Sequence, residues 1–448
     1  MSEPLENQRE FSPAYRNYAL GILFVGYIVN FVDRSILSLL LEPIKLELSL
    51  SDSQLGLLGG LAFAVFYTFL GIPIAALADR RSRVKILAVS MVIWSAMTAL
   101  CGLATNFWML LLARIGVGVG EAGASPPSHS LISDYFPIDK RATALSIYAL
   151  GIPFGTMIGS YVGGWGADEL GWRYTFFLVG IPGIFVAMII ALTLREPPRG
   201  LSDVKPAQSA AQKAAAEAAP KPEAPQVKEV LNFLWAKVSF RHLSFAAGLH
   251  AFVSYGASTW NAPFFTRIHS MSSTDLGAAL ALVAGVGAIG TFAGGYLSDK
   301  LSDRTGDKRW YFWVPGIATI IMVPFQLVAY LYDGTTAAIA SLCMVAIMGN
   351  VYLGPSFAMT QALVSLRMRA VASAILLFVL NLIGMGLGPY FVGILSDLFA
   401  PTFGVESLRY ALCIAVLVNL WAGVHYMLGA RSMRGDLLET EAMNAKLV

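Results

Sequence analysis

Long hydrophobic stretches alternate with short polar segments along almost the whole of this 448-residue chain. A helix needs about 20 predominantly apolar residues to cross a bilayer. Twelve runs of about that length occur near residues 18–41, 54–78, 86–104, 107–134, 141–168, 173–194, 241–266, 274–298, 311–332, 337–363, 370–398 and 408–430. The pattern therefore predicts an all-α integral membrane protein with twelve transmembrane helices.

The basic residues between these runs indicate which way the chain crosses the membrane. If the N terminus is inside, the cytoplasmic segments carry 25 Lys and Arg residues, or 17 without the long 195–241 connection. The outer loops then carry four: Lys45, Arg173, Arg267 and Arg409. Because Lys and Arg concentrate on the cytoplasmic side, both termini are expected in the cytoplasm of a protein of the plasma (inner) membrane.

A polar connection divides the twelve runs into two sets of six. Residues 195–226 are rich in Ala, Pro, Lys and Glu, a composition that predicts a flexible linker. After it, Val230, Leu231 and Leu234 recur at helical spacing, which predicts an interfacial helix. The expected domains are an N-terminal six-helix bundle (1–194), a cytoplasmic linker with its interfacial helix (195–240), a C-terminal six-helix bundle (241–430) and a cytoplasmic tail (431–448).

The two sets of six runs repeat one another. Asp79 and Arg80 recur as Asp299 and Lys300, with an offset of 220 residues. At an offset of 229, Gly120, Glu121 and Pro126 recur as Gly349, Asn350 and Pro355, and Gly159, Tyr161, Gly164 and Asp168 recur as Gly388, Tyr390, Gly393 and Asp397. Two pseudo-symmetric repeats of the same orientation are the arrangement of the major facilitator fold, whose binding site is expected between the halves near the bilayer midplane.

The composition narrows the function. Hydrophobic residues make up 56% of the chain and charged residues only 13%, against about 25% charged in soluble domains. The net charge of +3 comes without a basic cluster interleaved with aromatic residues, so nucleic-acid binding is not indicated. A Gly-rich phosphate loop for ATP is absent from the sequence, as is a nucleophile paired with a base. We therefore expect no enzyme, metal or cofactor, and energy from a proton gradient.

Four ionisable side chains lie inside the predicted spans: Asp33 and Arg34 in the first, Arg114 and Glu121 in the fourth. A charge at the centre of a membrane helix costs about 2.5 to 3.5 kcal/mol on insertion scales. Each of these side chains therefore needs an ion-pair partner, contact with water or a functional role. With Asn30, the first pair belongs to a polar stripe on an otherwise apolar helix. One interpretation is a structural ion-pair cluster, and the other is a wet functional site between spans one and four.

The spacing of these residues predicts how they pair. Sequence neighbours on a helix point about 100° apart, so Asp33 and Arg34 are poor partners. The expected cross-helix pair is Asp33 with Arg114, which leaves Glu121 without an obvious permanent partner. A carboxylate near an arginine changes its proton affinity when a ligand or a helix movement displaces that arginine. Asp33 and Glu121 are therefore candidate proton-coupling residues, and Arg34 or Arg114 is expected to hold an anionic head group.

Uncharged polar residues of the second half complete the predicted cavity. Ser254 and Trp260 lie in the seventh run and Asn350 lies in the tenth, and together with Asn30 they are the other candidate substrate-binding residues. His250, also in the seventh run, is expected to be neutral with a hydroxyl partner rather than a titrating group.

Several segments resemble the Spinster family of lysolipid and sphingolipid transporters within the major facilitator superfamily. They are NFVDRSILS in span one, ARIGVGVGEAG in span four and SLISDYFP at its end. The segment GIPIAALADRRSRVK resembles the signature loop of the superfamily, although Ser82 stands where Gly is usual. The resemblance implies that Asp33 and Glu121 couple to protons, that Arg34 and Arg114 are basic cavity residues, and that Asp79, Arg80 and Asp134 latch the outward-open state.

The resemblance also gives a meaning to a stripe of glycines in span five, Gly151, Gly155, Gly159 and Gly163, which recur every four residues. Small residues at this spacing permit close helix packing. In the superfamily, spans five and eight meet across the two halves. The stripe is therefore expected either to pack tightly or to form a smooth seam with span eight that opens sideways to lipid.

Taken together, the residues and the resemblance predict a proton-coupled secondary transporter of amphiphilic lipids that works by alternating access. The substrate would be lysophospholipid or sphingosine 1-phosphate-like, and the protein would act as a monomer among membrane lipids. The same charges also fit an organic-anion symporter or a multidrug exporter of the superfamily. A non-transporting membrane sensor is an alternative from another class, but neither the linker nor the tail offers an ordered cytosolic module.

Overall fold

A computed structural model describes residues 11–199, 201 and 226–445, and these residues form helices and loops without a strand. Most of the predicted linker, residues 200 and 202–225, lies outside the described residues. The helices are α1 (Pro13–Leu48), α2 (Asp52–Gly56), α3 (Ala62–Ala78), α4 (Arg83–Cys101), α5 (Phe107–Glu121), α6 (Ser125–Tyr135), α7 (Ile138–Ala149), α8 (Gly151–Glu169), α9 (Trp172–Thr193), α11 (Val227–Ala236), α12 (Val238–His269), α13 (Ser273–Thr305), α14 (Trp310–Leu331), α15 (Thr335–Gly349), α16 (Leu353–Ala362), α17 (Arg369–Val379), α18 (Gly388–Phe403) and α19 (Ser407–Ala445).

The described residues contain the twelve predicted membrane crossings. Ten stretches are long and apolar enough to cross a bilayer. One of these, Arg369–Met443, holds two crossings, because the chain turns at Gly404 and α19 packs back against α18. The remaining crossing is α12, in which His250 and several Ser, Tyr and Asn residues interrupt the apolar residues. The predicted all-α architecture is confirmed.

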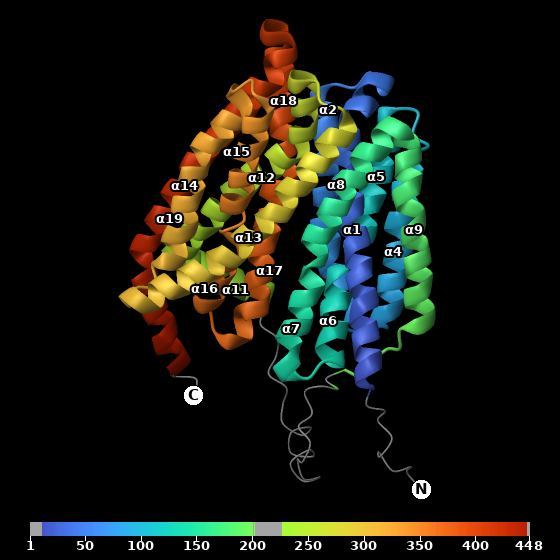
Figure 1. The fold of residues 1–448 in the computed structure, drawn as a ribbon. Coiled ribbons are helices and arrows are strands. Elements are labelled where there is room, and N and C mark those ends of the chain that lie inside the picture. Colours follow the sequence, from blue (N-terminus) through green and yellow to red (C-terminus); the bar gives the residue numbers. More distant parts are fainter. Residues whose placement is uncertain (1–10, 200, 202–225, 446–448) are drawn as a thin grey trace.

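Figure 1 shows α1 to α9 on one side of the molecule and α11 to α19 on the other. The start of α1 and the end of α19 lie at the same end, which we name the cytoplasmic end after the charge distribution. The halves pack through α8 with α13, α2 with α18, and α1 with α12. Among the described residues, the recorded hydrogen bonds between the halves all lie at the opposite, outer end. The described halves are therefore held together at the outer end.

Spans four and ten are broken at equivalent positions of the repeat. In the first half α5 ends at Glu121 and α6 begins at Ser125, and in the second α15 ends at Gly349 and α16 begins at Leu353. Proline is favoured in the first helical turn, where its missing N–H group is not needed. The prolines that follow Ser125 therefore start a new helix rather than only kinking an old one. Each break lies beside one chemically important residue, Glu121 or Asn350.

Spans two and eleven each contain a π-helical segment, at Leu57–Leu61 and Leu380–Leu387. The two segments contact each other across the halves. A Cβ atom on Gly60 would lie 2.8 Å from the carbonyl oxygen of Gly386, so the backbones approach closely there. Single π-helical turns inside α-helices are frequent at functional sites, and here they lie where one half meets the other.

The glycine stripe of α8 faces α1 of its own half. A Cβ atom on Gly155 would lie 2.6 Å from the carbonyl oxygen of Ile28, and one on Gly159 would lie 2.9 Å from that of Val32. The expectation that the stripe forms the seam with span eight is therefore wrong, because α8 has two packing faces. Tight packing is the meaning that the structure supports, and the seam with α13 uses Gly164 on the other face.

Gly120 provides a test of how tightly the first half is packed. A Cβ atom there would lie 2.5 Å from the backbone nitrogen of Trp94 in α4. We expect Gly120→Ala to destabilise the protein by about 1 to 3 kcal/mol, because α4 and α5 must move apart. Thermal unfolding in detergent measures this loss. Gly21→Ala is the control, since a Cβ atom there meets nothing within 4 Å. Equal melting temperatures for the two variants would contradict the close packing.

Candidate substrate and proton site

Arg34 of α1 and Glu121 of α5 form the central ion pair of the first half. Arg34 Nε donates to Glu121 Oε2 at 2.5 Å. The Glu121 side chain is fully buried, whereas 20% of the Arg34 side chain is exposed. Glu121 ends α5, and a carboxylate at a helix C terminus meets the negative end of the helix dipole. Glu121 therefore depends on Arg34 for its counter-charge, and the expectation that it lacks a partner is wrong.

Aromatic rings surround the guanidinium group of Arg34. Its Cζ atom lies 5.1 Å from the ring centre of Phe31, 5.0 Å from that of Phe63 and 4.7 Å from that of Tyr67. A cation within about 6 Å of a ring face is attracted by the ring quadrupole. The sequence interpretation missed Phe63 and Tyr67, because an aromatic residue in span two looks like any other lipid-facing or core residue. The rings fix Arg34 beside Glu121 and add apolar surface next to a cation.

Asp33 points into the interior of the first half. It is fully buried, and its one recorded hydrogen bond comes from the Thr98 hydroxyl of α4 at 3.4 Å. No ion pair joins Asp33 to Arg114 within the described residues, so the predicted pairing is not formed. The neighbours Asp33 and Arg34 do point in different directions, as expected. The rotation of α1 turns Arg34, rather than Asp33, towards Glu121.

Arg114 is buried and also lies beside Phe63. Its Cζ atom is 5.5 Å from the ring centre, so Phe63 contacts two arginines. Arg114 Nε and Nη1, Asp33 Oδ1 and Asn30 Nδ2 have no hydrogen-bond partner among the described residues. A buried polar atom without a partner costs about 1 to 3 kcal/mol. These four atoms favour a site that takes up water, protons or polar ligand groups.

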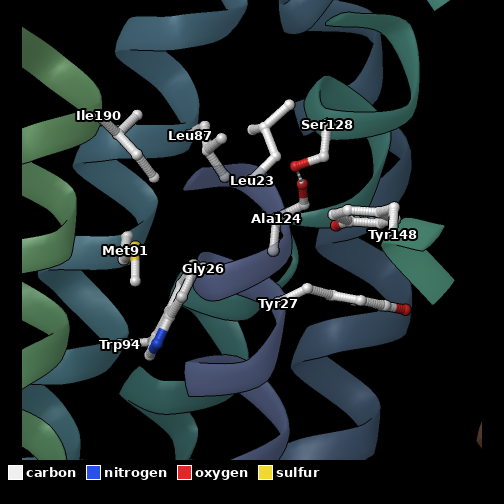
Figure 2. A pocket seen from close by; sticks show the side chains of 10 residues that line it. All are labelled: Leu23, Gly26, Tyr27, Leu87, Met91, Trp94, Ala124, Ser128, Tyr148 and Ile190. Carbon is white, nitrogen blue, oxygen red and sulfur yellow. Dashed lines mark hydrogen bonds between the residues drawn. The ribbon is translucent and has the colours of Figure 1, made fainter. Parts of the chain in front are cut away.

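A small cavity lies deeper in the first half, as Figure 2 shows. Tyr27, Trp94, Ser128 and Tyr148 supply its polar edges, and its volume is about 10 Å³. That is about the space that one water molecule needs. Trp94 Nε1 has no hydrogen-bond partner among the described residues. The polar interior of this half therefore extends from the Asp33 region towards the cytoplasmic end.

The candidate residues of the second half are scattered. Trp260 is fully buried, and its indole N–H donates to the Pro389 carbonyl at 2.8 Å, so it packs spans seven and eleven together. Asn350 is exposed at the break of span ten, where Nδ2 donates to the carbonyls of Gly287 and Ala346 at 3.2 and 3.0 Å. Ser254 is half-buried in α12. Of these three, Trp260 is too enclosed to contact a ligand in this arrangement.

His250 of the second half has two neutral partners. His250 is buried, with Nδ1 3.0 Å from the Thr319 hydroxyl and Nε2 2.8 Å from the Gly349 carbonyl. The predicted hydroxyl partner is confirmed. Nε2 must carry the proton that the carbonyl accepts, and Nδ1 then accepts from Thr319. Within the described residues, no group of three or more His, Cys, Asp or Glu side chains is placed to hold a metal ion.

At the cytoplasmic end of the first half, Arg83 binds several polar groups around it. It forms an ion pair with Asp134, donates from Nε to Glu196 Oε1 at 2.7 Å, and is almost completely buried. The sequence interpretation named Asp134 as a gating residue, but it missed Glu196. Asp79 and Arg80, the other two candidate gating residues, are exposed. The structure thus brings Asp134 to Arg83 and not to Arg80.

Glu196 is held in its ionised form, and about a third of its side chain, 34%, is exposed. Burial alone raises the pKa of this carboxyl, but hydrogen bonds outweigh that effect and lower the pKa below its usual range. The donors are the Val84 backbone N–H at 3.0 Å, Arg83 at 2.7 Å and the Ser82 hydroxyl at 2.7 Å. Because Ser82 precedes α4, Glu196 also places a negative charge at the N terminus of that helix.

A charged cluster closes the outer end, and the sequence interpretation did not find it. Arg267 of α12 binds Asp52 through both terminal nitrogens at 2.7 and 2.8 Å, and its Nε donates to Glu42 at 2.7 Å. Lys45 and Ser396 also donate to Asp52, each at 2.6 Å. Lys45 and Arg267 were counted only as outer-loop charges. Partners 215 residues apart in sequence give no local signal.

The comparisons with known proteins agree with this geometry. The family model described as Major Facilitator Superfamily matches residues 23–389. An MFS-type efflux pump of Mycolicibacterium smegmatis is 32% identical, with 94% of each chain covered. A sphingosine-1-phosphate transporter, SPNS2 of Danio rerio, is 33% identical over 41% of this chain and 37% of its own. A bacterial homologue of the human lysosomal transporter Spinster, solved in an inward-facing and unoccupied conformation, is 36% identical, with 95% of this chain and 99% of that chain covered and a TM-score of 0.86.

The Glu196 cluster predicts a pH dependence of stability. A carboxyl whose pKa is lowered by folding stabilises the protein above the pKa of the unfolded chain, and that contribution is lost as the pH falls through the folded value. Glu196→Gln should therefore cost about 1 kcal/mol at pH 7, a modest value because the carboxylate is partly exposed. The difference from wild type should persist down to about pH 4.5 and shrink below it.

Melting temperatures in detergent between pH 3.5 and 7 test this expectation. Glu169→Gln is the matched control, because Glu169 is an exposed carboxyl at the outer end of α8. A Glu196→Gln deficit that stays constant over the whole pH range would show that charge is not what this residue contributes.

Proposed function

This chain belongs to the major facilitator superfamily as a Spinster-like member, and from that premise we propose that it carries amphiphilic lipids in a proton-coupled manner. Its family makes it a secondary transporter that works by alternating access rather than an enzyme. The proposed cargo is a single-tailed lipid with an anionic head group, such as a lysophospholipid or a sphingosine 1-phosphate-like molecule. The observation that carries this proposal is the partly exposed Arg34 paired with the buried Glu121.

Arg34 is the residue best placed to hold the head group. Its bond to Glu121 uses Nε, which leaves the two terminal nitrogens of a partly exposed guanidinium for a phosphate. Arginine binds phosphate through two parallel hydrogen bonds, which adds geometric selectivity. Phe31, Phe63 and Tyr67 supply apolar surface beside the charge. The surroundings of Arg34 can therefore bind both a charged head group and the first carbons of an acyl chain.

The substrate phosphate and the Glu121 carboxylate compete for the same arginine. When a phosphate draws Arg34 away, Glu121 is left buried without a cation, and an unpaired buried charge is costly enough that the carboxylate takes up a proton instead. When the phosphate leaves, Arg34 returns to Glu121 and the proton is released. Asp33, already buried without a cation within hydrogen-bond reach, is the second proposed proton carrier. This exchange links cargo occupancy to proton occupancy.

The relatives support a lipid cargo and also keep one alternative open. The name of the Danio rerio relative describes a sphingosine-1-phosphate transporter, which favours a phosphate-headed amphiphile. The Mycolicibacterium smegmatis relative, similar over nearly the whole chain, is described as an efflux pump. Export of amphiphilic drugs is therefore the second candidate function. Both cargoes are amphiphiles, but only the lipid proposal requires the anionic head group that Arg34 would bind.

Head-group recognition can be tested with two arginine variants. Arg34→Ala should weaken binding of lysophosphatidic acid and sphingosine 1-phosphate by roughly 10- to 100-fold, the loss of a charge-assisted contact. Binding of a neutral monoacylglycerol should change little. Arg114→Ala should affect both classes of lipid equally, because Arg114 is buried. Binding is measured by thermal shift and by tryptophan fluorescence on the purified protein.

Two further variants separate loss of phosphate binding from loss of stability. Because Arg34→Ala leaves Glu121 unpaired, the Arg34→Ala, Glu121→Gln double variant removes both partners and should restore stability without restoring phosphate binding. Arg34→Lys keeps the charge but loses the bidentate geometry, so it should bind phosphate lipids with intermediate strength. Tight binding of cationic drugs together with indifference to phosphate lipids would favour the export alternative.

Proton coupling can be tested at the carboxylate itself. In proteoliposomes, lipid movement by the wild-type protein should respond to an imposed pH gradient, and Glu121→Gln should abolish that response because a glutamine cannot exchange a proton. Glu47→Gln is the control, since Glu47 is an exposed carboxylate paired with Arg173 at the outer end. If Glu121→Gln responds to the gradient as wild type does, Glu121 is a structural partner of Arg34 and not a proton carrier.

A further inference from the structure

Asp168 and Asp397 make the same contact at two places on the outer end. Asp168, at the end of α8, accepts from the backbone N–H groups of Ser273 and Thr274 at 3.2 and 2.7 Å and from the Thr274 hydroxyl at 2.8 Å. Asp397, in α18, accepts from the N–H groups of Asp52 and Ser53 at 2.9 and 2.7 Å and from the Ser53 hydroxyl at 2.5 Å. Each carboxylate thus caps a helix of the other half.

The two contacts are related by the internal repeat, atom for atom. Asp168 and Asp397 are 229 residues apart, and the capped residues Ser53 and Thr274 are 221 apart. In both, Oδ1 accepts from the first N–H group, and Oδ2 accepts from the second N–H group and from the hydroxyl. The first half therefore supplies one carboxylate and one capped helix, and so does the second.

Glycines allow the helices to approach closely enough for these contacts. Gly164 lies one turn before Asp168, and Gly393 lies one turn before Asp397. A Cβ atom on Gly164 would collide with the carbonyl oxygen of Ser273, and one on Gly393 would collide with that of Asp52. Each capping helix thus touches the first backbone carbonyl of the helix that it caps.

The capped helices have matching glycines. A Cβ atom on Gly277 would lie 2.5 Å from the carbonyl oxygen of Ser160, and one on Gly56 would lie 2.5 Å from that of Pro389. Ser160 and Pro389 are again 229 residues apart. The two seams between the halves therefore have the same composition. In each seam, one helix contributes a glycine and the capping aspartate, and the other helix contributes a Ser or Thr and a glycine.

We propose that Asp168 and Asp397, with these glycines, form two equivalent capping latches that hold the outer end closed. A carboxylate at a helix N terminus satisfies free N–H groups and meets the positive end of the helix dipole. Each latch joins the two halves, so outward opening must break both. Because water can hydrate the carboxylate and the N–H groups once they separate, the latches open without leaving a buried unpaired charge.

The size of the effect follows from the cost of losing a helix cap. Removal of a capping side chain changes stability by an amount that corresponds to roughly a 2- to 30-fold change in an equilibrium constant. Asp397 is half-buried and Asp168 is exposed, so Asp397→Ala should shift the population from inward-open to outward-open more than Asp168→Ala. The double variant should give about the product of the two shifts, because the latches lie on different seams.

Distances between spin labels on the reconstituted protein measure this shift without any substrate. One pair of labels at the exposed positions Thr105 and Val405 reports the outer end, and a second pair at Ile138 and Arg367 reports the cytoplasmic end. In the latch variants the outer distance should lengthen while the cytoplasmic distance shortens. An unchanged distance distribution in the double variant would overturn the proposal.

Matched variants separate the latch from a general loss of charge or of folding. Glu169→Ala removes the exposed carboxylate next to Asp168 and should leave both distances unchanged. Asp168→Asn and Asp397→Asn keep one acceptor oxygen and should give smaller shifts than alanine. Gly393→Val should open the outer end even with Asp397 intact. Equal shifts for Glu169→Ala and Asp168→Ala would overturn the proposal, and none of these results depends on which substrate is carried.

Discussion

The ion pair between Arg34 and Glu121 is the interaction on which the functional half of this protein depends. A carboxylate at the C-terminal end of a helix, away from water, is unfavourable on two counts, burial and the helix dipole. A cation in contact offsets both, and Arg34 of α1 supplies that cation beside three aromatic rings. The pairing therefore fixes how α1 is rotated. That rotation in turn sends Asp33 into the interior and leaves Arg34 as the partly exposed cation.

The contacts between the halves differ from the contacts within the first half in how deeply they are buried. Inside the first half, the ion pairs of Glu121 and Arg83 are buried, so breaking one would leave a buried charge without a partner. Between the halves, the capping carboxylates Asp168 and Asp397 are exposed or half-buried, and water can replace each of their contacts. The ion pairs of Arg267 with Asp52 and Glu42 also join the halves, but they are largely buried, so separating them costs more. The outer end is therefore closed by contacts of both kinds.

The sequence predicted the crossings, the repeat and the four membrane charges, because each leaves a local or periodic signal. It could not predict which charge faces which, since a rotation of α1 by about 100° exchanges the roles of Asp33 and Arg34. That is why the Asp33 and Arg114 pairing was wrong. Trp260 was misplaced for a similar reason, because a polar stripe does not say whether a neighbouring helix covers it. The outer cluster of Asp52 and Arg267 joins distant segments, and no spacing within one helix reveals it.

The repeat explains why symmetry is kept at the latches and lost at the site. Glu121 and Asn350 occupy equivalent breaks in spans four and ten, yet only the first carries a charge. A carboxylate at the second break would add one more charge inside the membrane, and each such charge adds its own cost. One charged site is enough to link a proton to a cargo. The two seams differ from the charged site in this respect. Halves that move as rigid bodies must close both seams together. Asp168 therefore needs its counterpart Asp397, while Glu121 needs none.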